Sequence, residues 1–150
     1  MICDCEHTTR SILDLQSTFQ RREVEASHVL ILLVEDDNDL RPEIAQYLER
    51  RGHVVIACGS LAEARTSLSR MMRAEPPEAV ICDVNLPDGD GVDFCCEASP
   101  LVPDARWLLM SGGHEPEEQA ERLALISGPQ RWLMVDKPIS MRQLNAALTP

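Results

Sequence analysis

Residues 29–37 read VLILLVEDD, six consecutive apolar residues followed at once by three acids. A strand with one face in water alternates apolar and polar side chains, whereas an unbroken apolar run is typical of a strand buried on both faces, as in parallel sheets. Open parallel sheets carry their ligand sites beyond the carboxyl ends of the strands. The stretch therefore predicts a buried parallel strand that ends in a cluster of acids.

The rest of the chain continues this alternation, because short apolar runs are followed by segments with helical periodicity. The expected strands are 29–34, 53–58, 79–82, 106–110 and 131–135, and the expected helices are 38–51, 60–72, 92–98, 115–126 and 139–148. Five successive strand–helix units predict an α/β fold, a doubly wound parallel sheet of five strands with helices on both faces.

Polar residues before two of the expected helices are typical N-terminal caps. Ser60 and Glu63 stand at the spacing of a capping box, in which each side chain hydrogen-bonds a backbone N–H near the other residue. Asp37 and Asn38 stand at the start of the first helix, and we expect both to cap it.

A polar segment precedes the predicted fold, which divides the chain into an N-terminal extension, residues 1–28, and a folded domain, residues 29–150. Ile12, Leu15 and Phe19 give the extension a weak helical pattern. A disordered leader, a helix packed on the domain and a dimerisation arm are all compatible with this pattern.

Composition excludes several classes of function. The chain has 150 residues with 25 acids against 14 Lys and Arg, a net charge of −11, which argues against nucleic acid as a direct partner because phosphate binding needs a basic surface. It contains no apolar run long enough for a membrane span and begins without the apolar region of a secretory signal. Six cysteines lack a framework spacing, so we expect reduced thiols and a cytoplasmic protein.

The residues that follow the strands carry the chemistry. Glu35 and Asp36 follow the first strand and Asp83 the third, so the topology brings three carboxylates to one edge of the sheet. Two like charges 4 Å apart repel by about 4 kcal/mol at an effective dielectric constant of 20, so the group favours a cation, and oxygen ligands suit Mg²⁺ or Mn²⁺. Ser111 directly follows the fourth expected strand, and Lys137 lies two residues after the fifth. Both side chains could hold phosphoryl oxygens. The set predicts phosphoryl transfer to a carboxylate, which forms an acyl phosphate.

Four motifs in order give a more specific interpretation: VEDD at 34–37, DVNLPDGDG at 83–91, LMSG at 109–112 and DKP at 136–138. Together they resemble the receiver domain of bacterial two-component response regulators, over about residues 29–148. The resemblance implies the flavodoxin-like receiver fold, consistent with the fold class expected from the strand–helix alternation.

The resemblance also implies roles for the acidic residues. Asp83 would be the phosphoacceptor. Glu35 and Asp36 would hold Mg²⁺ together with Asp83, one of them partly through water, and Asn85 would supply its backbone carbonyl to the metal. Glu35 stands where the family more often has Asp, a variation that still supplies a carboxylate.

The remaining implied roles concern the phosphoryl group and the switch. Lys137 would contact the phosphoryl group, Pro138 would follow a cis peptide bond, and Ser111 would bind the phosphoryl group on arrival and pull its loop inward. The switch position, usually Tyr or Phe in the family, is Met134 here. Trp132 lies two residues earlier and should point to the same side of the sheet by strand alternation.

These implications favour a single-domain response regulator, since the 13 residues that follow Lys137 leave no room for a DNA-binding domain. Such a protein positions its own acceptor and metal and is not expected to be a multiple-turnover enzyme. The phosphoryl donor would be a histidine kinase or a histidine phosphotransfer protein, and output would be a contact with a downstream protein, through helix 115–126, the fifth strand and the last helix. A phosphorelay intermediate and a phosphate-independent scaffold are the alternatives. A phosphohydrolase is disfavoured because Asn85 stands where such enzymes carry a second Asp. The protein could be a monomer or a homodimer.

Overall fold

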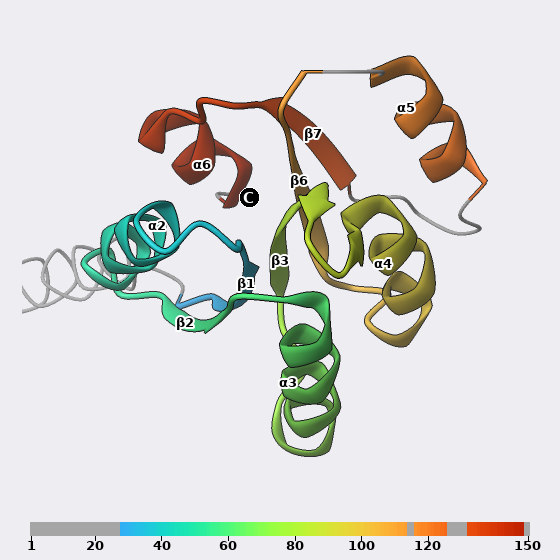
Figure 1. Ribbon diagram of the computed structural model, residues 1–150. Helices are drawn as coiled ribbons and strands as arrows, with labels where there is room; N and C mark the ends of the chain where they lie inside the picture. The colour runs from blue at the N-terminus through green and yellow to red at the C-terminus, as the bar shows by residue number, and fades with distance from the viewer. Residues whose placement is uncertain (1–27, 114–115, 126–131, 149–150) are drawn as a thin grey trace, which may run out of the picture.

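The computed structural model describes residues 28–113, 116–125 and 132–148 (Figure 1). The three interpretations of the N-terminal extension fall on residues outside this range. Within the described residues, no helix has both the length and the apolar character needed to cross a bilayer.

Five parallel strands form one sheet in the order β2-β1-β3-β6-β7. The strands are β1 (Leu30–Val34), β2 (Val54–Cys58), β3 (Ala79–Asp83), β6 (Arg106–Ser111) and β7 (Trp132–Asp136). From β1 the chain runs outward to β2 and then crosses back to β3 on the other side of β1. The strand order therefore reverses between β1 and β3, which is where open α/β sheets bind ligands.

Helices cover both faces of the sheet (Figure 1). They are α2 (Leu40–Glu49), α3 (Leu61–Ala74), α4 (Gly91–Ala98), α5 (Pro116–Ala124) and α6 (Met141–Leu148). α2 and α6 pack on one face, where Leu48 and Leu144 join the core, and α3, α4 and α5 pack on the other, where Phe94 and Leu123 join it. The predicted doubly wound sheet of five strands is confirmed.

The apolar run of β1 explains its central position. Leu32 and Val34 belong to the core cluster under α3, α4 and α5, while Ile31 and Leu33 belong to the cluster under α2 and α6. All four side chains are fully buried. Burial of apolar surface contributes about 25 cal/mol per Å² to stability. Burial on both faces therefore does more to place this segment at the centre of the sheet than the strand propensity of each residue does.

Local structure differs from prediction in two places. The expected loop over residues 85–91 contains two short antiparallel strands, β4 (Asn85–Leu86) and β5 (Gly89–Asp90), before α4 begins. A short 3₁₀ helix, η1 (Ser99–Leu101), extends the chain beyond α4. Both features lie in segments rich in turn residues. The local sequence preference there is weak, so tertiary contacts decide which secondary structure forms.

The predicted caps are partly confirmed. Asp37 Oδ1 accepts from the N–H groups of Asp39 and Leu40, at 2.8 and 3.0 Å, and so caps α2. The prediction for Asn38 was wrong, because its side-chain oxygen instead accepts from Arg41 Nη2 at 2.7 Å.

Only one half of the predicted capping box forms. Ser60 Oγ accepts from the Glu63 N–H at 3.2 Å and caps α3 as predicted. The carboxylate of Glu63 does not reach back to Ser60 but accepts from the N–H of Gly59, at 2.8 Å. The reciprocal bond is therefore displaced by one residue toward β2.

Burial raises the pKa of the core cysteine thiols and so makes them poor nucleophiles. Cys82 and Cys95 are buried in the same cluster, and desolvation raises the pKa of Cys95 to about 12 and that of Cys82 further still. Because the thiolate is the reactive form, we expect neither thiol to react with iodoacetamide at pH 8 on the time scale on which the half-buried Cys96 is labelled. Peptide mass spectrometry of the folded protein, with a urea-unfolded control, measures this; equal labelling of Cys82 and Cys96 would contradict it.

Candidate functional site

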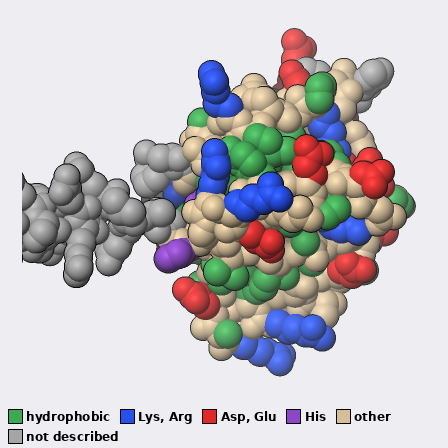
Figure 2. Space-filling view, turned by 90° about the vertical axis from the view of Figure 1, so that its left-hand side faces the viewer, with side chains coloured by type: hydrophobic (Ala, Val, Ile, Leu, Met, Phe, Trp, Pro, Cys, Tyr) green, Lys and Arg blue, Asp and Glu red, His purple; other side chains and the backbone are tan. Residues whose placement is uncertain are grey.

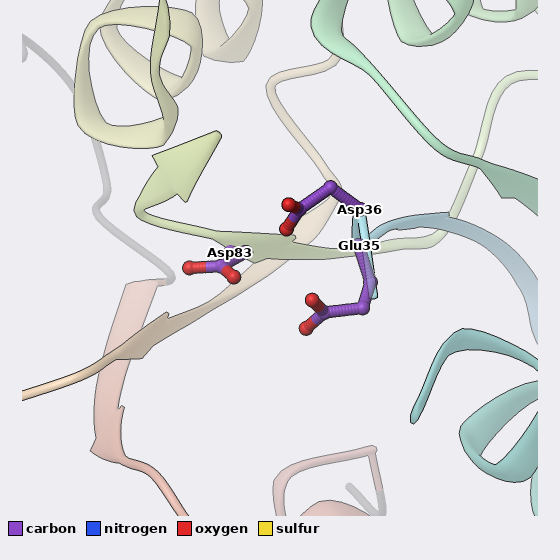
Figure 3. Close-up of side chains that lie close together, drawn as sticks. All are labelled: Glu35, Asp36 and Asp83. Carbon is purple, nitrogen blue, oxygen red and sulfur yellow. The ribbon is translucent and has the colours of Figure 1, made fainter. Parts of the chain in front are cut away.

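Three carboxylates meet where β1 and β3 end (Figure 3). Glu35 and Asp36 follow β1, Asp83 is the last residue of β3, and one carboxylate oxygen from each lies within 4.8 Å of the other two. Glu35 and Asp83 are buried and Asp36 is half-buried. The structure thus brings together the acids that the sequence predicts at this edge.

Lys137 bridges two of these acids. It follows β7, and its Nζ donates to Glu35 Oε2 at 2.9 Å and to Asp83 Oδ2 at 2.5 Å. The Lys137 N–H also donates to the carbonyl oxygen of Ser111, at 2.7 Å, which ties the end of β7 to the end of β6. The peptide bond between Lys137 and Pro138 is cis, as expected.

The electrostatics of the site follow from burial and pairing. Burial raises the pKa of Glu35 above its ordinary value, against the lowering effect of the hydrogen bonds from Lys137 and from the Asp37 N–H. Burial of the ammonium group works to lower the pKa of Lys137, but its hydrogen bonds with Asp83 and Glu35 outweigh this and raise it. With Asp36 included, three carboxylates against one ammonium group leave a formal charge of −2, which matches a divalent cation.

Both carboxylate oxygens of Asp83 are held. Oδ1 accepts from the Asn85 N–H at 2.9 Å, and Oδ2 accepts from Lys137. Asn85 is thus placed beside Asp83 at the start of β4, with an exposed side chain. These two hydrogen bonds restrain the orientation of the Asp83 carboxylate.

The predicted switch residues lie on β6, which pairs with β3, and on the edge strand β7, which pairs with β6. Ser111 ends β6 and is buried, and its Oγ lies 3.4 Å from the N–H of Gly113, which donates to it. Met134 is half-buried in β7 and packs, with Trp132, against the cluster under α3, α4 and α5. The expectation that Trp132 and Met134 point to the same side is confirmed.

Two supporting residues were missed in the sequence analysis. Arg41, on α2, donates to the backbone carbonyls of Glu35 and Asp36, and Gly91, at the start of α4, lies against the backbone of Asp83. A glycine in a turn-rich loop gave a weak signal for the second. An arginine on a helix surface gave none, because its contact depends on the three-dimensional path of the loop.

The donor set fits a hard divalent cation. Carboxylate oxygens from Glu35, Asp36 and Asp83 are the ligands that Mg²⁺ and Mn²⁺ prefer, and Mg²⁺ ordinarily keeps several water or phosphate oxygens in its remaining positions. An acidic group able to hold a metal is therefore placed directly beside Lys137, a cation that can bind a phosphoryl oxygen.

Comparison with known proteins identifies related sequences and folds. The family model described as "Response regulator receiver domain" matches residues 31–149. The response regulator receiver protein CpdR of Brucella abortus is 29% identical over 118 residues, which cover 76% of this chain and 88% of CpdR. The transcriptional activator DevR/DosR of Mycobacterium tuberculosis is 31% identical over 110 residues, 72% of this chain but 48% of that protein.

Other matches extend this picture. The photosynthetic apparatus regulatory protein RegA of Cereibacter sphaeroides is 32% identical over 82 residues, which are 55% of this chain and 42% of RegA. The chain therefore spans less than half of RegA and of DevR/DosR and most of CpdR. The CheY-like receiver domain protein of Methanospirillum hungatei superposes with a TM-score of 0.68 at 22% identity, over 80% of this chain and 90% of that one, which shows the shared fold.

Proposed function

The chain belongs to the response regulator receiver domain family, and from this membership we propose that it accepts a phosphoryl group on Asp83 in a Mg²⁺-dependent reaction. The observation that carries the proposal is the position of the Asp83 carboxylate. It is buried, 2.5 Å from Lys137 Nζ, and faces the carboxylates of Glu35 and Asp36. An acceptor, a metal-binding pair and a phosphoryl-binding cation thus share one small space.

In the proposed reaction the donor is a phosphohistidine of a histidine kinase or of a phosphotransfer protein. A carboxylate oxygen of Asp83 forms the new bond to phosphorus. The phosphorus–nitrogen bond of the donor breaks, its electron pair stays on the donor's histidine nitrogen, and that nitrogen takes up a proton from solvent. The bound Mg²⁺ would neutralise charge on the phosphoryl oxygens. Lys137 holds another of these oxygens, and the Asn85 N–H keeps the acceptor carboxylate oriented.

Phosphorylation would then change the surface near β6 and β7. We propose that the hydroxyl of Ser111 donates to a phosphoryl oxygen and draws its loop inward, and that Met134 moves with it in place of the usual aromatic residue. The altered surface comprises α5, β7 and α6 and would contact a downstream protein. A receiver related in fold, the beryllofluoride-activated NtrC4 receiver domain, is described as a dimer, so a homodimer of this chain is one form that the output could take.

We further propose that the protein acts in the cytoplasm as a stand-alone receiver without turnover of external substrates. The match to most of CpdR supports the single-domain interpretation, and Asn85 occupies the position of the acid/base residue of phosphohydrolases. Acidic and basic side chains are interspersed on the face seen in Figure 2, which does not offer the continuous basic surface that nucleic acid needs. An intermediate in a phosphorelay would use the same acceptor.

The test is phosphorylation by a small-molecule phosphodonor. With Mg²⁺ present, we expect the intact mass of the full chain to rise by one phosphoryl group, and we expect no such rise for Asp83→Asn or in EDTA. Asp93→Asn is the matched control, because Asp93 is exposed on α4 and pairs with Arg122 away from the acidic site. A folded parent that gains no phosphoryl group would instead favour the phosphate-independent scaffold, and an Asp83→Asn variant that gains one would show that a residue other than Asp83 is the acceptor.

A further inference from the structure

We propose that Arg41 is a positioning residue for the metal site, a role that rests on the proposed Mg²⁺-dependent function. Its guanidinium group acts on the backbone that carries Glu35 and Asp36 and thereby sets the direction of their carboxylates. Arg41 would neither bind the metal nor touch the phosphoryl group.

The contacts of Arg41 converge on the β1–α2 loop. Nη1 donates to the carbonyl oxygen of Glu35 at 2.7 Å and to that of Asp36 at 3.3 Å, while Nη2 donates to Asn38 Oδ1 at 2.7 Å. The planar guanidinium offers its donors in a fixed fork, so these bonds hold the loop at several points at once. Lysine, with one ammonium nitrogen, cannot reproduce this geometry.

The bonds matter because the loop carries adjacent metal ligands. When the carbonyl groups of Glu35 and Asp36 are fixed toward Arg41, the peptide planes on both sides of Asp36 are fixed, and with them the direction of its Cα–Cβ bond. Glu35 is restrained in this way only through the peptide plane that follows it. Glu35 is also restrained by Lys137 Nζ and by the Asp37 N–H. Asp36 is half-buried at the rim of the site, so we infer that it depends more on the backbone restraint.

The alternative is that Arg41 acts through its charge, and this would have the opposite effect on the metal. A nearby cation repels Mg²⁺, so its removal by itself would strengthen binding. Arg41 forms its hydrogen bonds with two backbone carbonyls and with the Asn38 side chain rather than with the carboxylates of the site. We therefore expect the effect of Arg41 on the position of the ligands to outweigh the effect of its charge on Mg²⁺ affinity.

Gly59, which follows β2, provides the space for the guanidinium. A Cβ at Gly59 would lie 3.1 Å from Arg41 Nη1, closer than most real contacts of this kind. The absence of a side chain at this position lets Arg41 lie over the loop. The end of β1 and the first turn of α2, which are close in sequence, and the end of β2 thus cooperate in a restraint beside the acids.

Calorimetric titration of the full chain with Mg²⁺ tests the proposal. We expect the dissociation constant to rise about tenfold both in Arg41→Lys and in Arg41→Gln, since changing groups that orient metal ligands typically weakens metal binding 10- to 100-fold. Arg50→Gln is the control, because Arg50 is exposed at the end of the same helix, and it should change the constant less than about twofold. Unfolding by urea in EDTA checks that each variant is folded.

The outcomes separate the two explanations. If charge were the mechanism, Arg41→Lys would bind as the parent does and Arg41→Gln more tightly, and this result would overturn the proposal. Asn38→Ala removes one anchor of the fork at an exposed position, so we expect a rise of about threefold. If the Arg41 variants fail to fold, unchanged affinity in Asn38→Ala overturns the proposal on its own.

A double-mutant cycle identifies the ligand through which Arg41 acts. In an Asp36→Asn background, we expect Arg41→Lys to change Mg²⁺ affinity less than about threefold, because the ligand that it positions is already lost. An unchanged tenfold effect in that background would refute the assignment to Asp36. A parent that binds no Mg²⁺ would overturn both the metal-dependent function and this inference, whereas a parent that binds Mg²⁺ with unaffected Arg41 variants would overturn the inference alone.

Discussion

Replacement of Lys137 by methionine is expected to destabilise the metal-free protein by about 3 kcal/mol, at the low end of the range for breaking a buried ion pair. Lys137 Nζ holds Glu35 and Asp83, whose side chains are 0% and 6% exposed. Methionine has a similar length and no charge, so the variant leaves two carboxylates facing each other out of water. The Lys137 side chain is itself 23% exposed, so water partly replaces the lost ammonium group and the cost stays near the lower limit.

Urea unfolding in EDTA and in saturating Mg²⁺ measures this effect. In EDTA we expect the full loss of about 3 kcal/mol in the free energy of unfolding. Mg²⁺ should restore part of this loss in the variant, because a ligand at 100 times its dissociation constant adds about 2.7 kcal/mol to the free energy of unfolding. Arg65→Met is the matched control. Arg65 pairs with Glu97 on the surface between α3 and α4, with both side chains about half exposed, and such pairs contribute about 0–1 kcal/mol. Equal losses in Lys137→Met and Arg65→Met would show that the buried pairing does not carry the stability we assign to it.

The sequence was informative where one physical effect dominated. The strand β1 was predictable because its apolar run exceeds what a half-exposed strand tolerates, and Ile31 and Leu32 do lie in cores on opposite faces of the sheet. The meeting of Glu35 with Asp83 was predictable from topology alone. The carboxyl ends of parallel strands share one edge, so residues 48 positions apart become neighbours whatever the intervening helices do.

The remaining features depend on contacts between segments that no local pattern specifies. Asn38 is a residue type that often caps helices, but its side-chain oxygen accepts from Arg41 instead, and Asp37 already satisfies the first N–H groups of α2. Arg122, on α5, contacts Asp90 at 3.1 Å as well as Asp93, and thereby links α5 to the first turn of α4. Nothing in the spacing of these residues indicates the pairing, because it depends on how α4 and α5 lie on the sheet.

Gly91→Ala is expected to destabilise the protein by about 3 kcal/mol, the upper part of the usual range for an overpacked core. A Cβ at Gly91 would lie 2.1 Å from the carbonyl oxygen of Asp83 and 3.0 Å from the Cα of Val84. Both neighbours are backbone atoms at the end of the central strand β3, so no rotamer change relieves the clash. The strand end, or α4 with its loop, must move instead.

The sign of this effect distinguishes crowding from helix propensity. Gly91 is the first residue of α4, and a glycine-to-alanine change in a compatible helical position ordinarily stabilises by about 0.4–1 kcal/mol. The expected loss of stability is therefore opposite in sign to the change that helix propensity alone would cause. Because the displaced backbone carries Asp83, Mg²⁺ affinity should fall together with stability, whereas a defect remote from the site would lower stability alone.

Gly112→Ala provides the comparison, since a Cβ at Gly112 has Asn85 Nδ2 as its nearest neighbour, at 3.9 Å. It lies in the same region of the molecule and should change the free energy of unfolding by less than about 0.5 kcal/mol. Urea unfolding and Mg²⁺ titration of both variants measure the two effects. A Gly91→Ala variant as stable as Gly112→Ala would show that β3 and α4 can separate without cost, and the close approach of α4 would then not be what fixes the position of Asp83.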